Sequence, residues 1–419
     1  MTRDAGHAAR LRAGVYYGWV MLGAVSVTEM TSWGVLYYAF TVFVKPMQAA
    51  LGWSTTALTG AFSLALLCSA VVALPVARWI DRHGTRWLMT VGSCAAALLV
   101  LAWAAVANLA LFYLIWAGIG VVVAAVLYDP AFALVAVWFR RQRSRAITIL
   151  TFIAGFASVI FVPLAAWLVQ AQGWRLALVT LAALLALLTI PAHALVLRRR
   201  PEDLGLAPDG LALAAADLAT SKPEEQGVSL RGALRAASFW WMAAAFALTT
   251  LAAVAVMVHL VPYLIDRGYS ASFAASMAGL IGLMALPGRL VFTPLGNMFP
   301  RRLVIAMICL LQAVSLVALV LVPGVVGVVG FVVLFGAGFG SITPARAALL
   351  ADYYGSTHYA KINSVLGLFV TGARALGPVG AGLLYDRLGT YLPIFWLLAV
   401  VSALAAGASL LVSQHSRFS

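Results

Sequence analysis

Runs of about twenty or more apolar residues recur along almost the whole chain, and this feature constrains the fold more than any other. Of its 419 residues, 64% are hydrophobic and only 10% are charged. A helix needs about 20 apolar residues to cross the hydrocarbon core of a bilayer, where its backbone groups must be satisfied internally. The pattern therefore predicts an all-α membrane protein without a soluble domain of useful size.

Charged breaks and breaks rich in proline and glycine divide the chain into twelve expected membrane-spanning helices. The first six are 15–44, 54–77, 87–107, 109–138, 146–171 and 174–197, and the second six are 238–264, 272–297, 303–322, 325–350, 362–385 and 390–413. The longest polar break, 198–237, begins with three arginines and continues rich in Pro, Ala, Gly and Ser, which is typical of an inter-domain linker. The expected organisation is an N-terminal segment 1–14, a six-helix bundle 15–197, the linker 198–237, a second six-helix bundle 238–413 and a C-terminal segment 414–419.

The distribution of positive charge indicates how the chain is oriented. Most of the 27 Lys and Arg residues fall in segments on the same side as the amino terminus. The opposite side carries Lys45, Arg175, Arg267 and Arg387. Because positive loops stay in the cytoplasm, both termini are expected there, with the chain in a cell inner membrane. The net charge of +14 is then mainly a topology signal with attraction to anionic lipid headgroups, and no nucleic-acid partner is expected.

Chemistry other than transport has little support in the sequence. The three cysteines, Cys68, Cys94 and Cys309, lack metal-ligand spacing, so neither a metal site nor a disulfide framework is predicted. No glycine-rich phosphate-binding loop and no combination of nucleophile, base and metal occurs. The chain is therefore expected to be neither an ATP-driven pump nor an enzyme, and to need no cofactor.

The two sets of spans repeat weakly. Pro130 in span four corresponds to Pro344 in span ten, and the same offset relates Phe139 to Tyr353. This correspondence predicts two pseudo-symmetric six-helix bundles. In transporters built from such repeats, one bundle rocks against the other around a site near the bilayer midplane, so a substrate is expected to bind between the halves.

The segment 77–86, between spans two and three, reads Ala-Arg-Trp-Ile-Asp-Arg-His-Gly-Thr-Arg. It resembles the Gly-x-Leu-x-Asp-Arg-x-Gly-x-Arg loop motif of the major facilitator superfamily, with Ala77 and Trp79 as departures. The resemblance implies a conformational latch, because an acid at a helix end pairs with arginine and with a helix terminus. Plain positive-inside anchoring is the alternative. The latch residues would be Asp81, Arg82, Gly84 and Arg86.

Further segments carry a closer resemblance: Gly18-Trp19, Trp138-Phe139-Arg140-Arg141, His259-Leu260-Val261-Pro262-Tyr263, and Gly377-Pro378 with Asp386-Arg387-Leu388-Gly389. They resemble the monocarboxylate porter branch of that superfamily, which includes bacterial oxalate/formate exchangers. In that branch an arginine of span eight holds the substrate carboxylate, and Arg289 lies at a suitable place. Animal members have a lysine for proton transfer where this chain has Tyr37 and Tyr38, so any proton coupling must use other residues.

Ionisable residues inside the expected spans are costly to insert and mark functional sites. They are Glu29, Asp129, His259, Arg289, Arg346 and Arg374. In the superfamily's arrangement, spans 1, 4, 7 and 10 face the central cavity and spans 2, 5, 8 and 11 flank it. All these charges are therefore expected on the cavity side.

The two deep arginines are candidate anion contacts. Arg289 offers a planar fork that matches a carboxylate, and Pro287 and Gly288 before it would bend the helix and let a substrate approach. A structural pair with Asp129 is the alternative. Arg374 is either a second anion contact, which would suit a dicarboxylate such as oxalate, or the partner that neutralises Glu29 or Asp129.

The other candidates are two carboxyl groups and three side chains able to hydrogen-bond. Glu29 and Asp129 are candidate proton carriers, because a low-dielectric surrounding favours the neutral form of a carboxyl group. His259 lies in a tract that resembles a substrate-contacting segment, with a hydrogen-bonding packing role as the alternative. Tyr128 and Tyr38 are expected to donate hydrogen bonds to a substrate carboxylate, unless they only pack.

These observations predict a secondary active transporter of a small organic anion. The leading hypothesis is a lactate- or pyruvate-like monocarboxylate carried in proton symport by alternating access. The alternatives within transport are exchange of dicarboxylates such as oxalate and efflux of another small solute. The alternative from a different class of protein is a non-transporting membrane sensor. A monomer is expected, because each twelve-helix chain forms a complete pathway.

Overall fold

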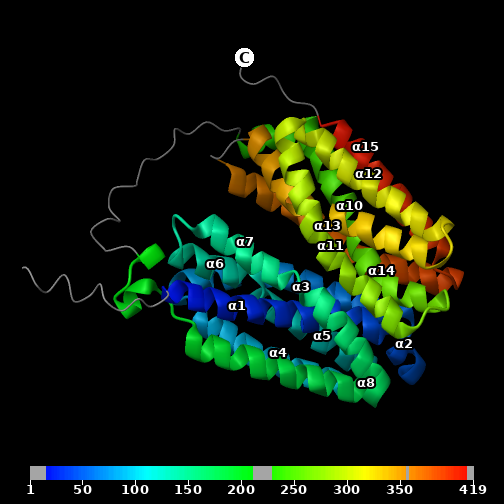
Figure 1. Ribbon diagram of the computed structural model, residues 1–419, viewed down its shortest axis with the longest axis horizontal. Coiled ribbons are helices and arrows are strands. Elements are labelled where there is room, and N and C mark those ends of the chain that lie inside the picture. Colours follow the sequence, from blue (N-terminus) through cyan, green and yellow to red (C-terminus); the bar gives the residue numbers. More distant parts are fainter. Residues whose placement is uncertain (1–15, 211–228, 355–357, 413–419) are drawn as a thin grey trace, which may run out of the picture.

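The computed structural model describes residues 16–210, 229–354 and 358–412, which form helices and connecting turns without a β-strand. The expected segments 1–14 and 414–419 lie outside the described residues, as do 211–228 of the linker. The chain folds into two bundles of helices that lie against each other (Figure 1). The first holds α1 to α8 and the second holds α10 to α15.

The first bundle contains α1 (Tyr17–Trp33), η2 (Gly34–Tyr38), α2 (Phe40–Leu51), α3 (Thr55–His83), α4 (Arg86–Ala104), α5 (Leu109–Val126), α6 (Tyr128–Trp138), α7 (Arg143–Ala154), α8 (Ala157–Pro191) and η3 (Ala192–Val196). Short helices η4 (Pro201–Leu204), η5 (Pro208–Gly210) and α9 (Leu230–Arg235) belong to the connection. The second bundle contains α10 (Ala237–Asp266), α11 (Ala271–Met298), α12 (Arg301–Leu321), α13 (Gly324–Tyr354), α14 (Tyr359–Leu388) and α15 (Leu392–Leu410).

The helices account for the expected crossings of a membrane. Within the described residues, 10 helical stretches are long and apolar enough to cross one. One of them, Arg143–Val196, is 54 residues long and turns at Gly173, whose φ of 78° suits a glycine, so it supplies spans five and six. The first span is divided among α1, η2 and α2. The predicted all-α fold of two six-helix bundles is confirmed.

Span one is interrupted by a π-helical turn. The backbone N–H of Ala39 donates to the carbonyl oxygen of Gly34 at 2.8 Å, five residues earlier. Glycine is needed there because a Cβ on Gly34 would lie 2.3 Å from the ring of Phe161 in α8. Such turns are frequent at functional sites. Here the turn contains Tyr37 and Tyr38.

Span four, expected as one continuous helix over 109–138, is also interrupted. Leu127 is extended (φ −94°, ψ −158°), and α6 starts anew at Tyr128. Pro130 is tolerated in the first turn, where its missing N–H leaves no helical hydrogen bond unmade. Asp129 lies in that same first turn, where the partial positive charge of the helix N-terminus favours an acid.

The first part of the linker is folded onto the first bundle. The carboxylate of Asp209 accepts hydrogen bonds from the backbone N–H groups of Arg140 (3.0 Å), Arg141 (2.8 Å) and Gln142 (3.2 Å), at the start of α7. Arg199 donates to the carbonyl oxygen of Arg82 at 2.6 Å. We call the end of the molecule with η4 and η5 the linker end, and the opposite end, where α2 ends and α3 begins, the far end.

The two bundles meet along three helix pairs: α3 with α14, α8 with α11 and α2 with α10. Small side chains allow close approach, since a Cβ on Gly279 would lie 2.8 Å from the carbonyl oxygen of Ser158. Ser158 Oγ donates to the carbonyl oxygen of Gly279 at 3.0 Å, and Thr41 Oγ1 donates to that of Val258 at 2.8 Å. In Figure 1 the bundles touch near α2 and α14 and diverge toward the end where α1 begins.

Close packing of α11 on α13 yields a stability prediction. A Cβ on Gly340 would lie 2.4 Å from the backbone oxygen of Ala285, whereas a Cβ on Gly330, in the same helix, meets nothing within 4 Å. Gly340→Ala is therefore expected to cost about 1–3 kcal/mol through overpacking. Gly330→Ala is expected to be neutral or stabilising, because alanine favours helix. Thermal unfolding of the purified variants checks this, and equal melting temperatures would contradict it.

Candidate functional site

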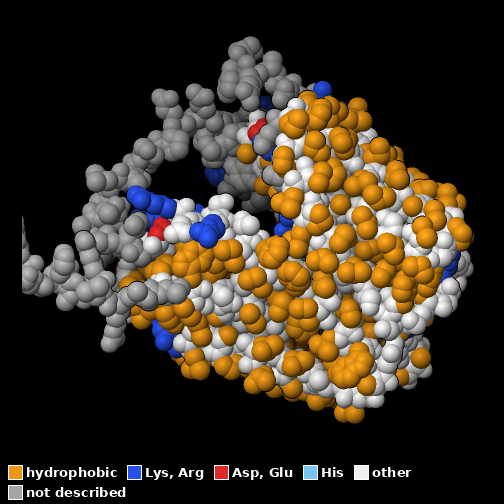
Figure 2. Space-filling view, viewed as in Figure 1, with side chains coloured by type: hydrophobic (Ala, Val, Ile, Leu, Met, Phe, Trp, Pro, Cys, Tyr) orange, Lys and Arg blue, Asp and Glu red, His pale blue; other side chains and the backbone are white. Residues whose placement is uncertain are grey.

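Charged side chains from both bundles gather between them. Asp129 in α6 and Arg374 in α14 are both exposed, although they lie within membrane-spanning segments, and they interact electrostatically across the interface. Charges at this depth face water rather than lipid. The space between the bundles is therefore open to solvent, and Figure 2 shows the surface hollowed where the bundles diverge.

Arg289 of α11 lies on the second-bundle side of this space and is half-buried. Its Nε donates to the carbonyl oxygen of Gly340 in α13 at 3.0 Å. Close helix packing makes this contact possible, since a Cβ on Gly288 would lie 2.1 Å from the carbonyl oxygen of Ala337. Within the described residues the ion pairs are Lys45–Asp266 and Arg301–Asp352, so Arg289 is not paired with Asp129. Its guanidinium is held at Nε, and no carboxylate of the described residues contacts the two terminal nitrogens.

The first bundle presents an aromatic wall, which we define as Trp33, Tyr37, Tyr38, Tyr128 and Phe132. The ring of Trp33 lies 5.2 Å from that of Tyr37 and 5.1 Å from that of Tyr128, centroid to centroid. Tyr128 and Phe132 stack at 5.0 Å and within 5°. All five side chains are half-buried. Tyr38 and Tyr128 lie within electrostatic range of Arg289, and Tyr37 and Tyr38 lie within that of Arg374, so the wall is close to both arginines of the second bundle.

Glu29 lies beneath this wall. Its side chain is fully buried, and neither carboxyl oxygen has a hydrogen-bond partner in the described part of the chain. Trp33 Nε1, one turn along α1, lies within electrostatic reach but outside hydrogen-bonding geometry. A buried polar group without a partner calls for an explanation, because an unpaired carboxylate at such a position costs several kcal/mol. Tyr128 and Asp129 are its electrostatic neighbours.

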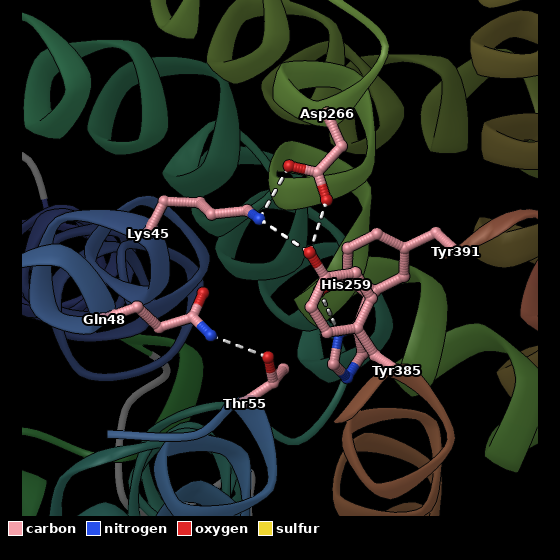
Figure 3. Close-up of polar contacts among 7 residues, drawn as sticks. All are labelled: Lys45, Gln48, Thr55, His259, Asp266, Tyr385 and Tyr391. Carbon is pink, nitrogen blue, oxygen red and sulfur yellow. Dashed lines mark hydrogen bonds and ion pairs between the residues drawn. The ribbon is translucent and has the colours of Figure 1, made fainter. Parts of the chain in front are cut away.

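His259 makes its contacts elsewhere. Its side chain is fully buried, and its Nε2 lies 2.9 Å from the carbonyl oxygen of Pro378, which only accepts, so Nε2 carries a proton and donates. Its Nδ1 lies 3.2 Å from the hydroxyl of Tyr391 (Figure 3). These contacts are with α14 and with the residue before α15, which favours the hydrogen-bonding packing role. In the described residues no group of three or more His, Cys, Asp or Glu is placed to hold a metal ion.

The motif between α3 and α4 makes contacts inside the first bundle. Arg86 donates through Nε and Nη2 to the carbonyl oxygen of Ala194, at 3.1 and 2.6 Å, and so holds the end of span six. Gly84, with a φ of 78°, packs against Arg199. Asp81 and Arg82 are exposed. In this structure the motif anchors span six and the linker, and its role as a latch between the bundles stays a prediction.

The structure also reveals a contact set that the sequence analysis did not single out. At the far end, Lys45 Nζ lies 2.6 Å from Oδ1 of Asp266 and donates to the hydroxyl of Tyr385 at 3.1 Å. That hydroxyl donates to Oδ2 of Asp266 at 2.8 Å (Figure 3). Asp386 accepts hydrogen bonds from the backbone N–H groups of Thr55 (3.0 Å) and Thr56 (2.8 Å) at the N-terminus of α3.

We call these contacts the far-end clamp, comprising Lys45, Asp266, Tyr385, Asp386 and the N-terminus of α3. Partial burial lowers the pKa of Lys45, which lies beyond the expected first span, but its bonds to Asp266 and Tyr385 outweigh that effect and leave the pKa above its usual value. The clamp ties the bundles together at the end opposite the linker. The only signal in the sequence was the Asp-Arg-x-Gly segment that begins at Asp386.

Known proteins resemble this chain over most of its length. Residues 22–342 match the model of the Major Facilitator Superfamily. Monocarboxylate transporter 13 of Bos taurus is 28% identical over 295 residues, which are 69% of this chain and 64% of the bovine protein. Uncharacterized transporter YybO of Bacillus subtilis (strain 168) is 30% identical over 153 residues, 36% of this chain and 35% of that protein. These matches span less than two thirds of the relatives' own lengths.

Solved structures agree on the fold. A bacterial homologue of the human lysosomal transporter Spinster, in an inward-facing and unoccupied conformation, superposes with a TM-score of 0.71 at 17% identity, covering 96% of this chain and 95% of that one. The occupied inward-facing form gives a TM-score of 0.73 at 16% identity, covering 95% and 97%. The family match covers well over half of the chain, and the fold agrees over nearly all of it. The chain belongs to the major facilitator superfamily of membrane transporters.

Proposed function

We propose that this transporter carries a small organic monocarboxylate together with a proton, by alternating access. The observation that carries the proposal is Arg289, whose guanidinium is anchored at Nε while its terminal nitrogens bind no carboxylate of the described chain. It faces a solvent-open space between the bundles. A guanidinium fork of this kind binds a carboxylate through two parallel, charge-assisted hydrogen bonds.

The balance of charge favours a monocarboxylate over a dicarboxylate. Arg374 lies within electrostatic range of Asp129 across the interface, so their opposite charges offset each other in part, although the two form no ion pair in the described residues. Arg289 then remains as the cation that a single substrate carboxylate neutralises. If Arg374 instead contacts the substrate, exchange of a dicarboxylate such as oxalate is the second candidate.

Glu29 is the side chain we propose to carry the proton. It is fully buried, unpartnered and close to Tyr128 of the site, whereas Asp129 is exposed and has Arg374 nearby. A protonated carboxyl group and a carboxylate bound to arginine together leave the closed site without excess charge, which eases its passage through the low-dielectric interior. The curated relative named as a monocarboxylate transporter supports the same class of substrate.

The arrangement of the bundles supports alternating access. The far-end clamp closes one end, and the bundles diverge at the linker end. With the basic linker end placed in the cytoplasm of a cell inner membrane, this is a state open to the cytoplasm. Each chain holds a complete pathway of this kind, so we propose that it functions as a monomer.

Uptake of radiolabelled lactate into proteoliposomes tests the proposed function. With the interior more alkaline than the medium, wild-type protein is expected to accumulate lactate above empty vesicles, and a protonophore is expected to abolish the accumulation. Glu29→Gln cannot exchange a proton, so its uptake is expected to lose the dependence on the pH gradient. Uptake that does not depend on the pH gradient but is stimulated by oxalate inside the vesicles would contradict symport and favour exchange. No uptake of lactate, pyruvate or oxalate would overturn carboxylate transport.

A further inference from the structure

The rings of the aromatic wall differ from the aromatic side chains that fill the core of the first bundle. The wall rings are all half-buried, so part of each ring remains accessible. The fully packed aromatics of the same bundle, by contrast, are at most 2% exposed. These packed rings include Phe40, Phe43, Phe62, Trp103 and Trp116. The wall is therefore partly accessible and not simply part of the core.

The wall presents both faces and edges of rings. Trp33 meets Tyr37 at an interplanar angle of 69°, and Tyr37 meets Tyr38 at 80° with centroids 5.1 Å apart. Tyr128 and Phe132 are parallel within 5°. Aromatic rings attract one another in offset-stacked and edge-to-face arrangements. A flat aromatic ligand has suitable partners in this wall, whereas the methyl group of lactate fills little of it.

Across from the wall lie two arginines of the second bundle, Arg289 and Arg374, and neither forms an ion pair in the described residues. Arg289 lies within electrostatic range of Tyr38 and Tyr128, so the cation and the rings are neighbours across the interface. Arg374 has Asp129 as its electrostatic partner. The site thus offers one anion contact from the second bundle and a ring-binding surface from the first.

We propose that the preferred substrate is an aryl carboxylate, with a flat ring against the aromatic wall and one carboxylate on Arg289. This inference rests on the proposed transport of monocarboxylates and narrows it to a chemical class. Tyr128 is the ring at the centre of the contact, because it lies between Trp33 and Phe132. The same geometry places ligand contacts on both bundles, so a bound aryl carboxylate bridges them.

Binding to purified protein in detergent tests the proposal, since neutral benzoic acid crosses bilayers unaided and obscures uptake. Calorimetry with benzoate, cyclohexanecarboxylate and lactate compares an aromatic ring, a saturated ring of similar size and no ring. Benzoate is expected to bind about tenfold more tightly than lactate and about threefold more tightly than cyclohexanecarboxylate. Equal binding of the two ring compounds would mean that the wall recognises apolar volume only, and would overturn the proposal.

Variants of Tyr128 separate its ring from its hydroxyl. Tyr128→Phe is expected to keep the preference for benzoate, whereas Tyr128→Leu is expected to weaken benzoate binding about fivefold and change lactate binding less than about twofold. Trp167→Leu, an exposed position in α8 outside the wall, is the matched control and is expected to change neither. Equal weakening of both ligands by Tyr128→Leu would show that the ring only packs, and would overturn the proposal.

The outcomes for this inference and for the proposed function are distinct. Gradient-driven lactate uptake without a preference for benzoate would overturn the aryl carboxylate alone. Binding of benzoate but not of cyclohexanecarboxylate supports it, whether or not lactate is carried. If correctly folded protein neither binds nor transports any of the three carboxylates, both proposals fail.

Discussion

Arg289→Gln is expected to reduce lactate uptake by about a hundredfold while leaving the fold intact. When the bundles close around the substrate, the pair of Arg289 and carboxylate is enclosed; truncating one partner of such a pair costs about 2–5 kcal/mol, and about 3 kcal/mol corresponds to a hundredfold change in affinity. Glutamine keeps much of the length of the side chain but removes the charge and the fork. Its single amide cannot donate both to Gly340 and, through two bonds, to a carboxylate.

Arg289→Lys is expected to remain impaired by about tenfold, because an ammonium group keeps the charge but lacks the planar fork. Initial rates of labelled lactate uptake in proteoliposomes measure both variants, with thermal unfolding as the check on folding. Arg231→Gln, an exposed position on α9, is the matched control and is expected to transport normally. A folded Arg289→Gln variant with wild-type uptake would remove the central support for the proposed function.

Arg374→Gln separates the two roles considered for the second arginine. If Arg374 only balances Asp129, lactate affinity is expected to change much less than in Arg289→Gln. If lactate affinity falls equally in Arg374→Gln and Arg289→Gln, both arginines contact the substrate. Exchange of dicarboxylates then explains the transport activity better than monocarboxylate symport.

Asp386→Asn is expected to loosen the far-end clamp and shift the protein toward the state open at the far end. The carboxylate accepts bonds from Thr55 N and Thr56 N at the N-terminus of α3, where a negative charge is favoured. Because Asp386 is largely exposed, solvent screening reduces this contribution to about 1–2 kcal/mol. That free energy corresponds to a shift of roughly 5- to 30-fold in the ratio of the two states.

Labelling of one buried cysteine from the far end measures this shift. Thr59 is buried, and a Cβ on Gly382 of α14 would lie 2.5 Å from its hydroxyl, so Thr59→Cys reports opening between α3 and α14. The background replaces the native cysteines Cys68, Cys94 and Cys309. An impermeant maleimide is expected to react several-fold faster in Asp386→Asn. Arg387→Gln, the adjacent exposed residue, is the control, and equal rates in all three proteins would show that Asp386 does not hold the clamp.

Lys45 contributes to the same clamp without making it sensitive to physiological pH. Its pKa is raised, so its contribution is fully present below the usual lysine value of about 10.4 and is lost only as pH rises through the higher value. Acidification therefore leaves the charge of Lys45 unchanged. A dependence of transport on pH between about 5 and 8 cannot come from Lys45, and under the proposed symport it is expected to be lost in Glu29→Gln.

The number and class of the spans were readable from the sequence because membrane insertion is a local property. About 20 consecutive apolar residues suffice to predict a crossing, whatever the helix later packs against. The same reasoning identified Arg289, Arg374, Glu29 and Asp129 as intramembrane charges, since their cost in lipid depends on position in the span. The structure confirms the fold and brings these four into one neighbourhood.

The tertiary structure decided which partners these residues have. The Nε of Arg289 is anchored because glycines on α11 and α13 let two backbones approach, and His259 is enclosed by α14 and Tyr391. The clamp joins Thr55 to Asp386, which are far apart in the sequence. Hydropathy along one segment reports how that segment meets lipid. Which helices pair, and at what distance, depends on the shapes of two surfaces together, and no single segment contains that information.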